Sequence, residues 1–456
     1  MIRSMLSRGC RVSFFGVGRS NLSLMRHLPL SNCKVTVRSD TKIIPSALPD
    51  FIRFDRIYEG EACCDGIDEK IIFFSPSVRR DRPELIRARD AGVIFTSDLE
   101  FFLEENRKPI FAVTGSDGKS TTASMMHSLL TTGGTTAALV GNIGEPMAEY
   151  LGADVDLYVM ELSSFMLSYA TVKARRGCIT NITPNHLDWH RDFSEYKKTK
   201  IALVKSSDEF VISENNSDIS GAYAIVGDKS GYKELVESYK AELYVTKEDG
   251  YILKNGERIL TLDDVLLRER HNIKNLMSSI AMTDGYVGND EIRAVARSFC
   301  GLGHRCQRIF SAMGVDYYDS SIDSTPARTA QTLSSLNRDS VIILGGRGKG
   351  VGYDGLKSVI RKYARQAIIV GENSGEIYEA IKGCTKCEVY KSFENAVMRG
   401  ASLARNVGTL LLSPASTSYD MFKNYAERGD KFKEIILKIH HFDNNSLQKT
   451  KDTRKT

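Results

Sequence analysis

The sequence lacks any apolar run that approaches the roughly 18 residues needed to cross a membrane, and no secretory cleavage site follows its first residues. It also lacks a strong excess of one charge. Lys and Arg number 62 against 57 Asp and Glu, which gives a net charge of +5. A nucleic-acid partner is therefore not required, and anionic small molecules fit this balance equally well. We expect a soluble, cytoplasmic monomer without a membrane span.

A regular cysteine framework is missing as well. The nine cysteines include a single CxxC, Cys384 and Cys387, with no second pair to complete a zinc site. Reduced thiols in a cytosolic protein explain these residues, with metal or redox use as the alternative.

What the sequence does contain is a globular composition, with 42% hydrophobic and 26% charged residues over 456 positions. Short apolar runs alternate with helical stretches, which predicts an α/β fold with parallel sheets. We expect three units in series, at residues 1–105, 106–305 and 306–456. Strands are expected at residues 11–15, 33–37, 71–74, 110–114, 341–344, 367–370 and 410–412.

The first unit contains a glycine turn directly after its first predicted strand. Gly16 and Gly18 resemble a dinucleotide-binding loop, but Asn21 stands where the third glycine of GxGxxG would fall. The turn therefore predicts a nucleotide or diphosphate site and does not indicate NAD.

The clearest motif is the glycine turn from Gly115 to Gly118, which separates a β-branched strand from a helix-forming run. Its backbone N–H groups, the helix N-terminus and Lys119 would together attract phosphates. Ser120 is placed to bind Mg²⁺, as the residue after the lysine does in P-loops. The turn is shorter than GxxxxGK[ST], and a glycine turn that happens to precede Lys-Ser is the alternative.

Polar residues also follow the next predicted strands. Asn142, Glu161 and His186 each stand where an apolar run ends. Ligands of open α/β sheets bind beyond the carboxyl ends of the strands, so these residues are expected to converge near Lys119. Taken singly, they could be a turn former, a surface acid and a helix cap.

These motifs resemble those of the Mur ligases. Residues 115–121 are similar to the family's GTNGKST loop, and residues 161–165, 181–188, 271–275 and 301–305 are similar to its further motifs. Residues 412–429 resemble a segment of the family members that add D-glutamate. The resemblance implies a Rossmann-like N-terminal domain, a central P-loop ATPase-like domain and a Rossmann-like C-terminal domain.

The resemblance also implies an activity. The family forms amide bonds in peptidoglycan precursor synthesis, and it activates a carboxylate with ATP as an acyl phosphate. The implied substrates are UDP-N-acetylmuramoyl-L-alanine and D-glutamate, and the implied cofactors are ATP and two Mg²⁺ ions.

Roles for individual residues follow from the resemblance alone. The catalytic residues would be Lys119, Glu161, His186 and Lys200, the last at the position that the family carbamylates. ATP would be bound by Gly115, Ser116, Asp117, Gly118, Lys119, Ser120, Thr121, Asn275, Arg305 and Asp319. The UDP-sugar would be bound by Arg19, Arg38, Ser39, Ser75, Asn142 and His186, and D-glutamate by Lys349, Ser418 and Tyr425. Mg²⁺ would be held by Ser120, Glu161, His186 and Lys200.

The sequence departs from the family pattern at a few positions. Asn185 replaces an Asp before the histidine, Ser321 replaces the lysine of a DSKATN motif, and Ser116-Asp117 replaces Thr-Asn in the loop. A P-loop kinase or ATPase would share the loop but would leave residues 413–429 unexplained. The pattern also leaves open a folylpolyglutamate-type or another Mur-type ligase, and a nucleotide-binding module without catalysis.

Overall fold

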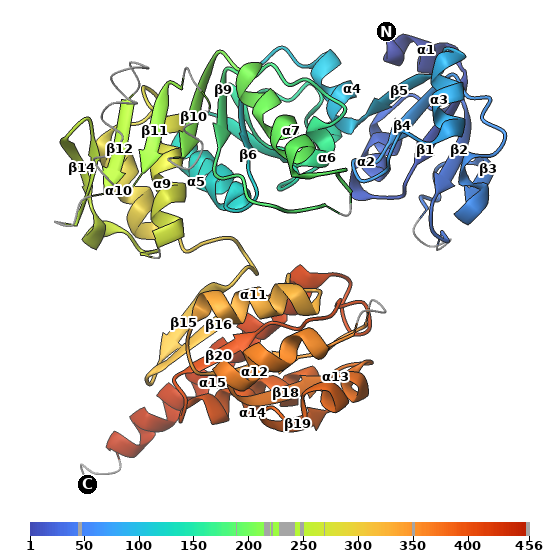
Figure 1. The fold of residues 1–456 in the computed structure, drawn as a ribbon. Coiled ribbons are helices and arrows are strands. Elements are labelled where there is room, and N and C mark those ends of the chain that lie inside the picture. Colours follow the sequence, from blue (N-terminus) through green and yellow to red (C-terminus); the bar gives the residue numbers. More distant parts are fainter. Residues whose placement is uncertain are drawn as a thin grey trace. The chain divides into compact units, whose positions relative to one another are not determined.

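The computed structural model describes residues 1–43, 48–187, 189–213, 219, 222–227, 242–246, 250–268, 270–348 and 352–452, and it describes no side chains at 213, 242–246 and 441–452. The chain forms two compact units, Met1–Phe299 and Cys300–Thr456, which are described one at a time (Figure 1).

Unit 1 begins with a five-stranded parallel sheet in the order β3-β2-β1-β4-β5. Alternate residues of its central strands face opposite sides. Phe14 stacks on Phe73 on one side, and Phe15 stacks on Phe74 on the other. Both sides are buried, which is why these strands are continuous apolar runs in the sequence. The elements are α1 (Ile2–Arg8), β1 (Arg11–Phe15), α2 (Arg19–His27), β2 (Lys34–Ser39), β3 (Phe54–Glu59), η2 (Gly60–Cys64), β4 (Ile71–Phe74), α3 (Pro83–Asp90), β5 (Ile94–Ser97) and α4 (Asp98–Glu105).

The second sheet of unit 1 has nine strands in the order β14-β13-β12-β11-β10-β9-β6-β8-β7. Its pairs are parallel from β7 to β12, whereas β13 and β14 continue the sheet as an antiparallel edge. The elements are β6 (Ile110–Thr114), α5 (Lys119–Thr132), β7 (Ala137–Gly141), η3 (Met147–Tyr150), β8 (Leu157–Glu161), α6 (Ser164–Leu167), β9 (Arg176–Ile179), α7 (Phe193–Lys205), β10 (Glu209–Ser213), β11 (Ala224–Gly227), β12 (Glu242–Thr246), β13 (Tyr251–Lys254), β14 (Glu257–Thr261), η6 (Leu262–Asp264), α9 (Arg270–Met282) and α10 (Asn289–Ser298).

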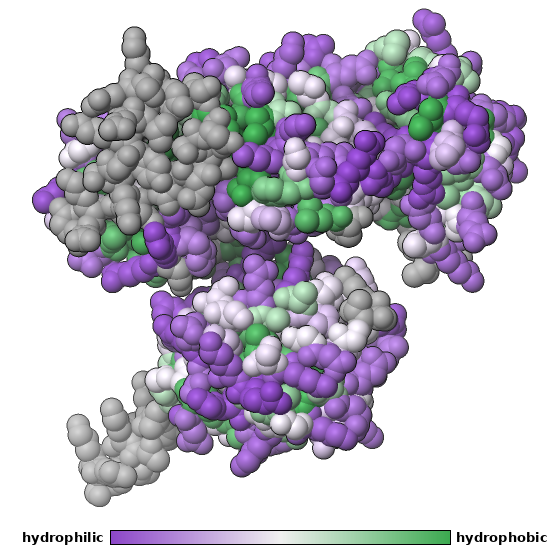
Figure 2. All heavy atoms as spheres, viewed as in Figure 1, coloured by the Kyte–Doolittle hydropathy of each residue, from purple (hydrophilic) through white to green (hydrophobic). Residues whose placement is uncertain are grey.

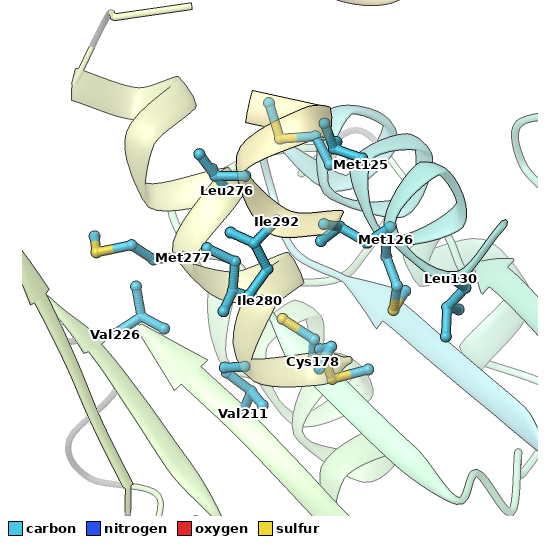
Figure 3. Close-up of a cluster of buried hydrophobic side chains, with 14 of the residues drawn as sticks. Met125, Met126, Leu130, Cys178, Val211, Val226, Leu276, Met277, Ile280 and Ile292 are labelled. Carbon is cyan, nitrogen blue, oxygen red and sulfur yellow. The ribbon is translucent and has the colours of Figure 1, made fainter. Parts of the chain in front are cut away.

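The main core of unit 1 fixes the helix that follows the glycine turn. Met126 and Leu130 of α5, Ile280 of α9 and Ile292 of α10 meet Cys178 of the sheet in one buried cluster (Figure 3). The start of α5 is thereby held at the carboxyl end of β6, where a phosphate loop must lie.

Unit 2 is built on a six-stranded sheet in the order β15-β16-β20-β17-β18-β19, with β15 antiparallel to the rest. Strands β17 and β20 are buried along their whole length. The elements are β15 (Gln307–Ala312), β16 (Val315–Asp319), α11 (Pro326–Leu336), β17 (Ser340–Leu344), η7 (Asp354–Leu356), α12 (Lys357–Tyr363), β18 (Ala364–Val370), α13 (Ser374–Ile381), β19 (Lys386–Tyr390), α14 (Phe393–Ala404), β20 (Thr409–Leu412) and α15 (Tyr425–Asp452).

The parallel sheets confirm the predicted α/β class. The predicted strands at 11–15 and 71–74 coincide with β1 and β4, and β2 runs to Ser39, two residues beyond the expected end. The antiparallel strands β13 to β15 were not predicted. The edge strands β14 and β15 have several exposed or partly exposed residues, and β13 has only four residues, of which two are buried.

Polar side chains dominate the faces in view (Figure 2). None of the helices in the described part of the chain is both long enough and apolar enough to cross a bilayer.

The core cluster leads to a stability prediction. Leu129 of α5 is fully buried, so Leu129→Ala should lower the free energy of unfolding by about 2–5 kcal/mol. Thr131→Ala, at an exposed position two residues later, should change it by less than about 0.5 kcal/mol. Urea denaturation followed by circular dichroism measures both. Equal effects of the two substitutions would contradict the role given to this core.

Candidate active site

The turn between β6 and α5 has a backbone that only glycine accommodates. Gly118 has a φ of 77°, and a Cβ added there would lie 2.4 Å from Oδ1 of Asn275. A Cβ added to Gly115, whose φ is 150°, would lie 2.0 Å from Oγ1 of Thr180. The predicted ATP-binding residue Asn275, on α9, is thus packed directly against the turn.

Residues that follow β9 brace this turn from the side. The Ser116 N–H donates to the Asn181 carbonyl at 2.8 Å, and the Asp117 N–H donates to Oδ1 of Asn181 at 3.0 Å. The Asp117 carbonyl accepts from Oγ1 of Thr180 at 2.6 Å and from Nδ2 of Asn181 at 3.0 Å. The segment predicted to carry a second motif therefore holds the first one in shape.

The first residues of α5 place a cation and a hydroxyl beside the turn. Nζ of Lys119 donates to the Ser116 carbonyl at 2.8 Å, so the ammonium group stays over the turn. Ser120 is buried in the first turn of the helix, next to Thr121. A helix N-terminus with an adjacent lysine is an anion-binding arrangement.

Glu161 and Asn142 meet at the ends of neighbouring strands. Gly141 of β7 is in register with Glu161 of β8, and Nδ2 of Asn142 donates to Oε1 of Glu161 at 2.8 Å. The Glu161 side chain is fully buried, and no hydrogen-bond partner reaches its Oε2 among the described residues. A buried carboxylate oxygen left in this state suits a cation ligand.

Lys200, on α7, is buried beneath the phosphate turn. Its Nζ donates to the Gly115 carbonyl at 2.7 Å and to Oγ1 of Thr114 at 3.3 Å, and lies 4.7 Å from the centre of the Tyr196 ring. Burial, with a further contribution from the charge of Lys119, lowers the pKa of Lys200 to about 7, against the opposing charges of Glu161 and Asp117. Lys119, Glu161 and Lys200 are therefore close enough to act on one another electrostatically.

His186 lies near Phe165 and Tyr196. It has a φ of 53°, and its exposed ring lies 4.9 Å from the Phe165 ring and 6.5 Å from the Tyr196 ring. The hydroxyl of Tyr196 is 2.9 Å from Oγ of Ser116. Tyr196 thus contacts the phosphate turn, Lys200 and the His186 loop. No motif in the sequence indicated Tyr196 as a site residue.

The glycine turn of the first sheet lies close to this group. Asn21, at the place of the missing third glycine, is fully buried, and its Nδ2 donates to the carbonyls of Phe15 and Gly16. The same amide group is 3.3 Å from Oγ of Ser75. Arg19, the first residue of α2, donates to the Gly144 carbonyl in the loop that follows Asn142.

A small hollow of unit 1 is lined by Ser20 of α2, Asp98 of α4 and Phe165 of α6, and by Pro76 and Arg80 from the loop after Ser75. None of the predicted site residues in the described part of the chain lines it. Burial raises the pKa of Asp98 to about 7. Nearby, Arg79 donates to the Trp189 carbonyl, so the loop after Ser75 also touches the His186 loop.

Arg38 differs from its expected setting. It lies in β2 and not in a loop, and its side chain is fully buried, with the guanidinium paired to both carboxylate oxygens of Glu69. Further N–H groups donate to the carbonyls of Cys63 and Asp65. Arg38 therefore holds the residues after η2, and Ser39 beside it is also buried.

In unit 2, Arg305 follows His304 in the sequence, and Asp319 contacts the His304 ring. Nδ1 of His304 is 2.7 Å from Oδ2 of the buried Asp319, which raises the pKa of the histidine. Arg305 itself is exposed. Ser418 is buried in the loop after β20, and Tyr425 is exposed at the start of α15. Lys349 lies outside the described residues.

The structure shows what surrounds Ser321, where the family pattern has a lysine. Oγ of Ser321 accepts from Nε of the buried Arg428 at 2.9 Å, and its carbonyl accepts from Nη2 at 2.8 Å. Burial lowers the pKa of Arg428 to about 10. A cation from α15 thus occupies this neighbourhood, which a comparison of the motif alone does not reveal.

Comparisons with known proteins identify relatives of this chain. The family model of the Mur ligase middle domain matches residues 113–283. The chain has the fold of UDP-N-acetylmuramate-alanine ligase MurC from Thermotoga maritima, with a TM-score of 0.58 and 18% identity over 94% of this chain and 99% of that one. It is also similar in fold to a pseudomurein peptide ligase type C from Methanothermus fervidus, with a TM-score of 0.50 and 14% identity over 94% and 100% of the two chains.

Similarity in sequence is higher to named enzymes. The UDP-N-acetylmuramoylalanine--D-glutamate ligase of Clostridium botulinum (strain 657 / Type Ba4) is 33% identical over 93% of this chain and 96% of its own. The enzyme of the same name from Acetivibrio thermocellus is 33% identical over 94% and 96% of the two chains. The chain belongs to the Mur ligase family.

The phosphate turn can be tested through its glycines. Gly118→Ala should abolish measurable ATP binding, because the added Cβ meets Asn275. Gly134→Ala is a matched control: its φ of 84° is similar, but the new Cβ would have nothing within 4 Å. It should cost about 1–2 kcal/mol of stability and leave ATP affinity intact. Isothermal titration calorimetry with a non-hydrolysable ATP analogue measures the affinities, and similar losses in both variants would count against the proposed turn.

Proposed function

We propose that the protein is an ATP-dependent ligase that joins D-glutamate to UDP-N-acetylmuramoylalanine in peptidoglycan precursor synthesis. As part of the same proposal, we expect a monomer that acts in the cytoplasm. The observation that carries the proposal is the group formed by the glycine turn, Lys119, the buried Glu161 and the buried Lys200. The names of the relatives supply the choice of substrates.

The chemical problem of this reaction is the low reactivity of a carboxylate toward an amine. Transfer of the γ-phosphoryl group of ATP to that carboxylate gives an acyl phosphate, and attack by the amine then releases phosphate. Several anionic groups must come together for the transfer, so the protein has to position and neutralise them. The N–H groups at the start of α5, just after Gly118, and the ammonium group of Lys119 suit the triphosphate.

Mg²⁺ fits the oxygen donors beside the turn. Oε2 of Glu161, at the end of β8, has no hydrogen-bond partner among the described residues, and Ser120 follows the parallel neighbour β6. We propose these two hard ligands for one ion and His186 for a second. Bound Mg²⁺ would offset the charge of the transferred phosphoryl group. Asn142, whose Nδ2 donates to Oε1 of Glu161, is proposed to contact the UDP-sugar as well.

Lys200 is suited to carbamylation. Only a neutral amine adds carbon dioxide, and the pKa of about 7 makes most of this side chain neutral at pH 8. A carbamate would change the group from a neutral amine to an anion near Glu161 and would thereby strengthen the proposed Mg²⁺ site. The amino-acid substrate is proposed to bind in unit 2 through Ser418, Tyr425 and Lys349.

The ligase activity has a direct test. Incubation with ATP, Mg²⁺, UDP-N-acetylmuramoyl-L-alanine and D-glutamate should give a product whose mass exceeds that of the UDP-substrate by one glutamyl residue. L-Glutamate, alanine and diaminopimelate serve as competing acceptors. Lys119→Ala should lower kcat/KM by at least about 10³-fold, because the cation at the phosphates is lost. Release of phosphate that needs no amine would instead indicate an ATPase.

Carbamylation can be followed separately from activity. Incubation with ¹³C-bicarbonate should give a carbamate signal in the NMR spectrum of the wild type at pH 8 that weakens as the pH falls below about 7, where Lys200 is protonated. Lys200→Ala should lack the signal and lose activity that short carboxylic acids partly restore. The exposed Lys198→Ala variant is the matched control. A signal that persists without Lys200 would refute the assignment.

A further inference from the structure

Three buried side chains of unit 2 form a hydrogen-bonded ring close to Ser418. Asn373 is 6% exposed, Tyr353 4% and Ser416 1%. Nδ2 of Asn373 donates to the Tyr353 hydroxyl and to Oγ of Ser416, the latter at 2.7 Å, and the two hydroxyls are 3.1 Å apart. Asn373 precedes α13, Tyr353 precedes α12 and Ser416 follows β20. The ring therefore connects segments that are distant in the sequence.

The backbone fixes the orientation of the Asn373 amide. Its Oδ1 accepts from the Gly346 N–H at 3.0 Å, and the Asn373 N–H donates to the Gly346 carbonyl at 3.0 Å. Since an N–H group faces Oδ1, the donor Nδ2 must face the two hydroxyls, which accept from it. The hydrogens of Tyr353 and Ser416 are consequently not directed at Asn373.

The ring joins two loops that carry the predicted amino-acid site. The N–H of Arg347 donates to the Thr417 carbonyl at 2.9 Å, and the N–H of Thr417 donates to the Arg347 carbonyl at 3.0 Å. Arg428 holds the other side of the second loop, donating to the Ser416 carbonyl at 3.1 Å and the Thr417 carbonyl at 3.2 Å. Hydrogen bonds therefore link residues 346–348 to residues 416–418, and Asn373 contacts both segments.

We propose that Asn373 is a positioning residue for the amino-acid substrate, acting through Gly346 and Ser416 on the segments 346–348 and 416–418. The inference rests on the proposed function, which places the amino acid at Ser418. An amide is suited to this role because it satisfies one N–H group and two hydroxyls without adding a charge that would repel a dicarboxylic substrate.

The test compares variants of equal size. In Asn373→Asp the Gly346 N–H keeps its acceptor, but both hydroxyls must turn to donate to the new carboxylate, which also adds a negative charge. The KM for D-glutamate should rise about tenfold or more, the equivalent of one ordinary hydrogen bond. Tyr353→Phe, which keeps the bond between Asn373 and Ser416, should raise it by a smaller factor. In both, kcat and the KM values for ATP and the UDP-substrate should stay within about twofold.

Ser340→Ala is the control, since it removes a buried hydroxyl at the opposite end of β17, where Oγ donates to the Arg338 carbonyl at 3.0 Å. It should leave all three KM values unchanged. The inference is overturned if Asn373→Asp and Tyr353→Phe leave the KM for D-glutamate within about twofold, or if they raise all three KM values together. If the melting curve shows that the Asp variant does not fold, the KM for D-glutamate of Tyr353→Phe alone decides whether the inference holds.

A failure of the proposed function looks different. If the wild type uses another amino acid and not D-glutamate, the substrate assignment fails on the unmodified protein. Asn373 is then judged by the KM for the amino acid that is used.

Discussion

The shape of the phosphate turn depends on hydrogen bonds that its carbonyl oxygens accept. In this protein side chains supply those bonds at the first three residues of the turn. The Gly115 carbonyl accepts from Lys200, the Ser116 carbonyl from Lys119, and the Asp117 carbonyl from Thr180 and Asn181. One of these partners, Lys119, also brings a positive charge to the turn. Lys119 therefore meets a requirement for backbone hydrogen bonding and a requirement for charge at the same time.

In unit 2, buried side chains also satisfy the backbone carbonyls of a loop, and fewer of these side chains are charged. The loop after β20 is paired with Arg347 at Thr417, and its carbonyls at Ser416 and Thr417 also accept from Arg428. Arg428 is buried at a cost that appears as its lowered pKa, whereas Asn373 holds the neighbouring segment as a neutral amide. In both units, the segments that carry proposed ligand-binding residues are held by side chains buried behind them, which lets short loops keep one shape.

The sequence predicts the parts of this structure in which local pattern and environment coincide. Strands β4 and β17 are buried on both faces, so their apolar runs are visible without any other information. The meeting of Asn142 and Glu161 is predictable too, because each directly follows or ends one of two neighbouring strands. Tyr196 could not be found in this way: a tyrosine on an amphipathic helix reads as a core residue, and its hydroxyl contact with Ser116 depends on how α7 packs. Asn373 has no signal beyond its position before a helix.

Arginines near a predicted diphosphate site show why residue type alone is an incomplete guide. Arg38 and Arg19 both follow or end strands of the first sheet, and both were expected to face the UDP-sugar. All N–H groups of Arg38 donate to Glu69 and to carbonyls within residues 63–66, so binding a phosphate directly would leave those buried groups unpaired. The Arg19 side chain is 69% exposed, and it contacts Gly144 and Glu145 in the loop after Asn142. Of the two, Arg19 can turn to an anion at little cost, and Arg38 contributes by keeping the strand end beside it in place.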